Sequence, residues 1–366
     1  MGKREVERLH QSLSTHMSNI HETLQILDQK PASSLQKVSW DEAIKIGEQV
    51  SKHATTAGML FTEVRTEVKA LEENMGVYFN ALQGLLLLAY GSTVGTGPTL
   101  SSSIHASIKN IVDCSFKLWC ECVSSYGSHK EEQKRAIPPL VGSVWDACSA
   151  LKKTPATNIT AIGREMTRVA VSIKDVLREM KELEPSSSDP TNEVSEPDKG
   201  EGQPHGSDIS DDDDNDDDLG KDLSPEEIKV AQLAIGVVSE VVNVIKELIR
   251  SITGLHKKGS LVEEKDGLES LEDLLTLCRG VGVLVDELGA CLYPPQEYSA
   301  IKKACEDISS KTDDMQKGLE RLNCSIEPFS QCCKSLKKAS ELLVHEISYS
   351  TAVDIEPQMQ NLAARD

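Results

Sequence analysis

Apolar residues recur every three or four positions along most of the chain, which is the spacing of one buried face on an α-helix. In residues 4–28, for example, Val6, Leu9, Leu13 and Met17 follow one another at this spacing. No stretch shows the apolar–polar alternation typical of a half-buried strand. With Pro, Gly and capping residues taken as boundaries, the pattern predicts about ten helices. They span residues 4–28, 39–64, 68–90, 99–125, 138–151, 158–184, 224–255, 262–292, 297–323 and 327–350.

Proline and serine mark two of these helix starts. Ser224 and Glu227 have the spacing of a capping box, in which each side chain bonds the backbone N–H of the other residue. Pro225 follows Ser224 at the first helical position, where a missing N–H costs nothing. By the same reasoning, Pro138 and Pro139 predict the start of another helix.

An acidic segment at residues 185–222 interrupts the helical pattern. It contains fourteen Asp or Glu and two Lys, and therefore carries −12 of the formal net charge of −20. Such a segment buries too little apolar surface to offset the entropy of ordering it, and its like charges extend it. We therefore expect an all-α fold of two helical bundles joined by a disordered acidic linker. The expected domains are an N-terminal helical bundle at 1–184, the linker at 185–222 and a C-terminal helical bundle at 223–366.

The linker holds two candidate phosphosites, Ser207 and Ser210. Ser207 precedes Asp208, and Ser210 precedes the run that begins at Asp211, which is the context that acidophilic kinases prefer. Each phosphate would add about −1.5 to −2 charges. A plain solvated tether is the simplest interpretation of the acidic run itself, with weak calcium binding and mimicry of nucleic-acid phosphate as alternatives.

Three leucines seven residues apart, Leu261, Leu268 and Leu275, form a partial heptad. The next two heptad positions are Gly282 and Gly289, so the repeat does not continue for the three to four heptads that a coiled coil needs. We expect these leucines to face the core of a bundle instead of forming a zipper.

The cysteines do not have the spacing of a metal site. Cys120 and Cys122, and the neighbours Cys332 and Cys333, are the closest groups, and no His pair stands near them at ligand spacing. The N-terminus lacks the apolar core of a signal peptide, which favours free buried thiols over disulfides. We therefore expect no metal ion.

The sequence also lacks a catalytic pattern. His10, His16 and His21 share the first helix without an acidic partner at a recognisable spacing. There is no glycine-rich phosphate loop, nucleophile elbow or metalloprotease motif. We expect no catalytic residue and no cofactor, and hence a protein that is not an enzyme.

Charge and hydropathy exclude two classes of partner. An acidic chain without a basic face is unsuited to direct nucleic-acid binding and to anionic membranes. The longest apolar run, Leu85–Tyr90, is too short to span a bilayer. We therefore expect the partners of this chain to be proteins.

The order of several short motifs resembles the GCIP family, the D-type-cyclin-interacting or cyclin-D-binding proteins, also described as human homologues of a maternal Id-like molecule. The resemblance covers roughly residues 39–325. It is carried by Ser143-Val144-Trp145-Asp146-Ala147-Cys148, a helix that ends in Glu-Met-Lys-Glu-Leu, the acidic linker, Ser224-Pro225-Glu226-Glu227, Leu271-Glu272-Asp273 and Asp286-Glu287-Leu288 leading to Tyr293-Pro294-Pro295.

This resemblance implies an all-helical, non-enzymatic regulator of the cell cycle and of transcription. Its expected partners are D-type cyclins and helix-loop-helix transcription factors, and its expected location is the nucleus and the cytoplasm. An Id-like protein pairs with such a factor but adds no phosphate contacts, so the complex binds DNA poorly. Gly282 and Gly289 depart from the zipper that the family description includes.

Two alternatives stay open. Long bundles of Leu, Val and Ala also suit a helical scaffold or adaptor of the talin and vinculin type. A helical enzyme is the second alternative, and a cluster of ionisable residues in one cleft would favour it. The sequence assigns neither the oligomeric state nor the contact residues.

Overall fold

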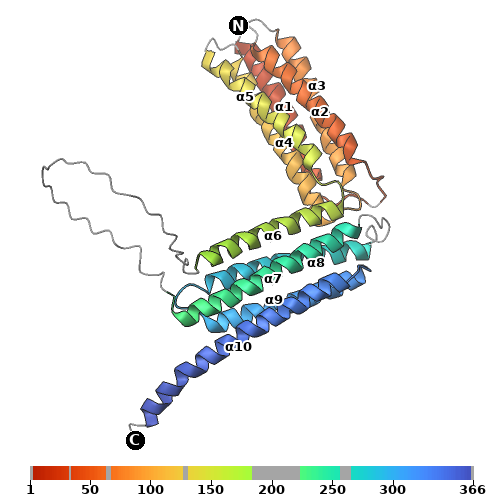
Figure 1. The fold of residues 1–366 in the computed structure, drawn as a ribbon. Coiled ribbons are helices and arrows are strands. Elements are labelled where there is room, and N and C mark those ends of the chain that lie inside the picture. Colours follow the sequence, from red (N-terminus) through yellow and green to blue (C-terminus); the bar gives the residue numbers. More distant parts are fainter. Residues whose placement is uncertain are drawn as a thin grey trace, which may run out of the picture. The chain divides into compact units, whose positions relative to one another are not determined.

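The protein is all-helical, in agreement with the prediction. A computed structural model describes residues 3–32, 34–62, 67–126, 131–183, 223–255 and 265–363, and for 3, 131–134, 265 and 350–363 it describes the backbone alone. These residues form ten α-helices in two groups, one short 3₁₀ helix (Leu151–Lys153) and no strand (Figure 1). The α-helices are α1 (Lys3–Ile26), α2 (Trp40–Thr62), α3 (Val68–Ser92), α4 (Pro98–Ser125), α5 (Glu131–Ala150), α6 (Asn158–Glu182), α7 (Pro225–Leu255), α8 (Lys265–Ala290), α9 (Tyr298–Arg321) and α10 (Glu327–Ala363).

The predicted capping box at the start of α7 is confirmed. The backbone N–H of Ser224 donates to Glu227 Oε2 at 2.9 Å, and the N–H of Glu227 donates to Ser224 Oγ at 3.2 Å. Two donors that the helix itself leaves unpaired are thereby satisfied. The carboxylate of Glu227 also accepts a 3.3 Å bond from the backbone N–H of Gln296, which ties the α8–α9 loop to this helix start.

Two helix boundaries differ from the prediction. Pro138 and Pro139 lie inside α5, which begins at Glu131, and do not start it. Extending the helix upstream places Ile137 in the core, where it is fully buried. The free energy gained by this burial outweighs the cost of the backbone hydrogen bonds that the two prolines cannot donate. Helix α10 continues to Ala363 and does not end near residue 350, because Glu, Gln and Ala favour a helix in this segment although Pro357 lies among them.

Helices α1 to α5 form the first compact unit, which includes the described residues up to Arg164 and the start of α8 up to Glu272. Its core is aromatic at the centre. The Trp119 ring lies 5.3 Å from Tyr78 and 5.8 Å from Phe61, both at the steep angles that aromatic pairs prefer. The Tyr78 hydroxyl lies 2.6 Å from Ser115 Oγ. Since the Ser115 hydroxyl donates to a backbone carbonyl, Tyr78 is the donor in this pair.

The second compact unit contains residue 165 onward of α6, the helices α7, α9 and α10, and α8 from Asp273. Helix α7 is its most apolar element, and Val237, Val238 and Val241 are fully buried. By length and composition, α7 is the one helix in the described ranges that could cross a membrane. Because 56% of its most apolar window is buried inside the unit, it has the pattern of a core helix.

The grouping by contacts places residues 165–182 with the C-terminal helices, whereas the prediction assigned 1–184 to the N-terminal bundle. Most of α6 therefore packs with helices that follow the acidic segment. The predicted linker, at 185–222, lies wholly outside the described residues. The domain boundaries stay a prediction.

Helices α6 and α8 run parallel and pack closely through two glycines. A Cβ atom on Gly282 would lie 3.0 Å from Val169 Cγ1, and one on Gly289 would lie 3.0 Å from Val176 Cγ1. Both the glycines and the valines are seven residues apart, so the same register holds along the pair. An ion pair between Arg279 of α8 and Glu165 of α6, with a distance of 3.5 Å, joins the two helices further toward their N-terminal ends. The heptad positions that lack leucine are the positions at which α6 approaches α8.

Candidate functional site

The predicted phosphosites Ser207 and Ser210 lie outside the described residues, and so does Leu261 of the partial heptad. The other two heptad leucines do not share one environment. Leu268 is half-buried against Gly97 in the first unit, whereas Leu275 is buried in the second, with 1% of its surface exposed. The structure therefore places these two leucines in intramolecular packing.

All ten cysteines carry free thiols. Burial raises the pKa of Cys148, Cys278 and Cys305 to about 12, and that of Cys333 to about 11. The described residues hold no group of three or more His, Cys, Asp or Glu side chains able to bind a metal ion together. The buried thiols are therefore packing groups in the folded protein.

The three histidines of α1 separate into two environments. His16 stacks on the ring of Phe79, with ring centroids 5.1 Å apart and planes 4° from parallel, and burial lowers its pKa. His10 and His21 are exposed and line a groove on the first unit. They lie eleven residues apart on one helix, about 16 Å along its axis, so they do not act on one atom.

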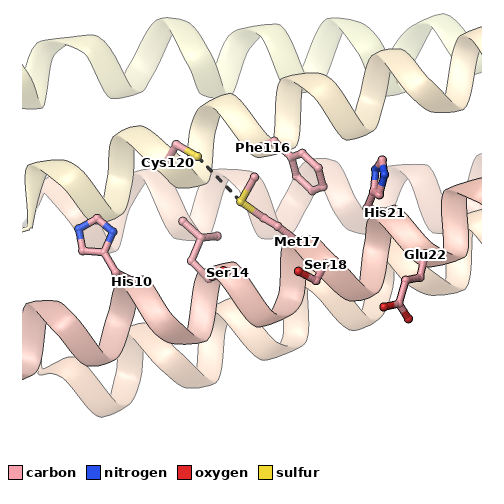
Figure 2. Close-up of a pocket in the computed structure, with 9 residues that line it drawn as sticks. His10, Ser14, Met17, Ser18, His21, Glu22, Phe116 and Cys120 are labelled. Atoms are coloured by element: carbon pink, nitrogen blue, oxygen red, sulfur yellow. Dashed lines mark hydrogen bonds between the residues drawn. The ribbon is translucent and has the colours of Figure 1, made fainter.

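This groove, called the α1–α4 groove here, is the larger of the two concave surfaces described below (Figure 2). Its volume is about 570 Å³. Helix α1 supplies most of the lining at helical spacing, and α4 supplies Phe116 and Cys120. The lining residues are His10, Leu13, Ser14, Met17, Ser18, His21, Glu22, Phe116 and Cys120.

The reactive side chains that line the α1–α4 groove lie apart from one another. The Cys120 thiol lies 3.9 Å from the Met17 sulfur, and both side chains point into the middle of the groove (Figure 2). Burial raises the pKa of Cys120, so the thiol stays protonated near neutral pH. His21 contacts Gln25 across one helical turn, at 3.3 Å, and not the thiol. A nucleophile, a base and an orienting group do not converge here.

A second groove, called the α6–α8 groove, lies within the second unit at the C-terminal ends of these two helices. Its volume is about 240 Å³. Helix α6 contributes one side, and α8 with the residues that follow it contributes the other. The lining residues are Val176, Glu179, Met180, Leu183, Asp286, Gly289, Ala290 and Tyr293.

Sequence reasoning identified neither groove. Both are made by pairs of helices that are distant in the chain, and periodicity alone does not show which helices pair. One signal was present for the α6–α8 groove, since two glycines seven residues apart in a helix indicate close approach by another helix.

Two family models match the chain. The model described as Grap2 and cyclin-D-interacting, N-terminal, matches residues 42–186, and its C-terminal counterpart matches residues 209–317. A curated relative, the cyclin-D1-binding protein 1 homolog of Xenopus laevis, is 21% identical over 233 residues. That similarity covers 63% of this chain and 64% of the relative, which is less than two thirds of its length.

Proposed function

Because the chain belongs to the Grap2 and cyclin-D-interacting (GCIP) family, we propose that it is a non-enzymatic regulatory protein that binds D-type cyclins and restrains the cell cycle. The observation that carries this proposal is the match to both parts of the family, at residues 42–186 and 209–317, with the gap between the two matches inside the acidic segment. The name of the Xenopus relative supports the same partner.

The chemistry of the described surface fits such a role. Both grooves combine an apolar lining with a polar edge, which is the composition of protein contacts. The α1–α4 groove presents Met17, a flexible side chain that adapts to different partners, beside the aromatic ring of Phe116. An enzyme would need its ionisable groups brought together, and the histidines of α1 are held apart.

Size-exclusion chromatography with light scattering tests the proposal. The full chain is run alone, then with a purified D-type cyclin, and a cyclin of another class serves as the matched control. Co-elution with the D-type cyclin alone, at the summed mass, is the expected result. Separate elution of both proteins at micromolar concentration would remove D-type cyclins as partners of the isolated chain.

Helix-loop-helix transcription factors are the second proposed partners, by an Id-like mechanism. The charge of the chain favours this candidate: a formal net charge of −20 opposes contact with DNA phosphates, so a complex with such a factor loses affinity for DNA. In a gel-shift assay, adding the chain should weaken DNA binding by the factor. Unchanged binding at saturating protein would exclude this mechanism.

The proposed location is the nucleus and the cytoplasm, where D-type cyclins and transcription factors both are accessible. The mass of 40.0 kDa allows slow passive entry into the nucleus. Fractionation of cells that express the tagged full chain tests this proposal, and recovery from the membrane fraction alone would contradict it.

A further inference from the structure

The α6–α8 groove follows a helical repeat on both of its sides. On one edge, Asp286 and Ala290 of α8 are four residues apart, and Tyr293 follows three residues later in the turn after the helix. On the other edge, Val176 and Glu179 of α6 are three residues apart, and Leu183 follows four residues later, just after the helix. A furrow edged in this way matches the side chains of another helix laid into it.

The groove exposes apolar surface that the second unit does not cover. Tyr293, in the turn after α8, is 53% exposed although it is large and aromatic, and Ala290 at the end of α8 is exposed as well. Met180 is buried beneath, with 2% of its surface exposed, and provides a floor. Because Gly289 brings Val176 against α8, this floor is continuous from one helix to the other. An exposed aromatic side chain beside an apolar floor is typical of an interaction site.

The edges of the groove are acidic. Glu179 on α6 and Asp286 on α8 are exposed, and neither forms an ion pair with any of the described residues. Glu182 and Glu287 add further negative charge next to the lining, so acidic residues outnumber the exposed Lys181 beside them. The nearby Arg178 is already paired with Asp175, at 3.2 Å. An occupant with lysine or arginine beside its apolar residues would neutralise these edges.

We propose that the α6–α8 groove docks one amphipathic helix of a partner protein, with apolar side chains at i, i+3/i+4 and i+7 and with Lys or Arg flanking them. The proposal rests on the proposed function, in that it assigns a surface and a chemistry to a partner of this regulatory protein. The negative edges oppose the two occupants that the chain itself offers, which are its own segment 185–222, with a charge of −12, and a second copy, with a charge of −20.

The family comparison locates this groove in the matched regions. Its α6 residues lie within 42–186, and its α8 residues lie within 209–317, so each of the two family regions supplies one side. By contrast, the residues that α1 contributes to the α1–α4 groove precede residue 42. Of the two grooves, the α6–α8 groove is the one built wholly from the parts that place the chain in its family.

The test uses the full chain and a labelled synthetic helix of 18 residues, with leucines along one face and lysines beside them. A matched peptide carries glutamates in place of the lysines. Fluorescence anisotropy should show saturable binding of the basic peptide and none of the acidic one. The double variant Glu179→Lys/Asp286→Lys should weaken binding of the basic peptide by about tenfold or more. The variant Tyr293→Ala should weaken it by about fivefold through lost apolar contact.

The matched control is Glu306→Lys/Glu341→Lys, which makes the same change in net charge at exposed sites on α9 and α10. Peptide affinity should stay within about twofold of wild type in this control, since distant surface charges are screened. Circular dichroism checks that every variant is folded. Equal loss in both double variants, or equal binding of both peptides, would overturn the proposal. A wild-type dimer that the groove variant dissociates would assign the groove to a second copy, which also overturns it.

A D-type cyclin titrated against the same variants separates this proposal from the proposed function. If the cyclin does not bind but the basic peptide binds in a manner sensitive to Glu179 and Asp286, the groove proposal survives and D-type cyclin binding fails. If the cyclin binds and the peptide does not, the groove proposal fails while the proposed function stands.

Discussion

Gly289 of α8 lies so close to Val176 of α6 that a Cβ atom on the glycine would be 3.0 Å from Val176 Cγ1. Seven residues earlier, Gly282 meets Val169 at the same distance. These contacts explain why the leucine heptad stops where it does. Larger side chains at these two positions would push α6 away from α8, and the edges of the α6–α8 groove would separate with them.

Restoring the heptad should therefore destabilise the protein. We expect Gly289→Leu to lower the free energy of unfolding of the second unit by about 2–3 kcal/mol, because the added side chain has no space beside Val176. Urea denaturation followed by circular dichroism measures the change. In the control, Gly236→Ala on α7, nothing lies within 4 Å of the new Cβ, and the better helix propensity should add about 0.5–1 kcal/mol. Equal stability of wild type and Gly289→Leu would contradict the close packing.

Glu272 should stabilise the first unit from its place on α8. Its carboxylate accepts a 3.1 Å bond from the backbone N–H of Thr99 and a 2.6 Å bond from the Thr99 hydroxyl, in the first turn of α4. A carboxylate at a helix N-terminus satisfies an unpaired donor and interacts favourably with the helix dipole. We expect Glu272→Ala to lower the free energy of unfolding by about 1 kcal/mol. Glu269→Ala, at an exposed site three residues earlier, is the control and should change it little; equal effects would refute the capping role.

His16 should make stability depend on pH in the acidic range. Burial against Phe79 lowers its pKa in the folded protein, so near pH 6.5 the unfolded chain binds the proton more readily. The contribution of neutral His16 to the free energy of unfolding is fully present above the pKa of the unfolded chain. It decreases as the pH falls from about 6.5 toward the pKa of the folded protein. The difference between wild type and His16→Gln in urea midpoints at pH 5 and pH 7.5 measures this contribution. A difference that does not change with pH would contradict it.

The buried thiols should resist modification in the folded protein. With a pKa of about 12, Cys148, Cys278 and Cys305 have about one thiolate in ten thousand at pH 8, and they are also shielded from reagent. Iodoacetamide labelling followed by peptide mapping should modify the exposed Cys120 first and these three after denaturation. Labelling of Cys278 as fast as Cys120 in native buffer would show that the second unit opens readily.

Helical content was predictable from the sequence because it depends on local spacing. The capping box of Ser224 and Glu227 shows this well, since all of its partners lie within four residues. The start of α5 was not predictable in the same way, because Ile137 is drawn into a core built by distant segments. Pro138 favours a helix start at its own position, but tertiary packing places the start of α5 upstream, at Glu131.

The grouping of the helices and the grooves could not be derived from periodicity. Residues 165–182 of α6 pack with helices that follow the acidic segment, although they precede it in the chain. In the sequence, Gly282 and Gly289 mark only the positions where the leucine heptad stops. The position of α6 shows that these glycines allow a close contact between two helices. Surface grooves depend on such pairings, so the sequence alone did not mark Tyr293 and Ala290 as groove residues.

Calorimetric titration of a purified D-type cyclin into the full chain measures directly whether the chain binds these cyclins. We expect saturable binding with one cyclin per chain, and no comparable heat from a cyclin of another class. Absence of binding heat at two temperatures, with both proteins folded and at concentrations of tens of micromolar, would contradict the claim that this chain binds D-type cyclins.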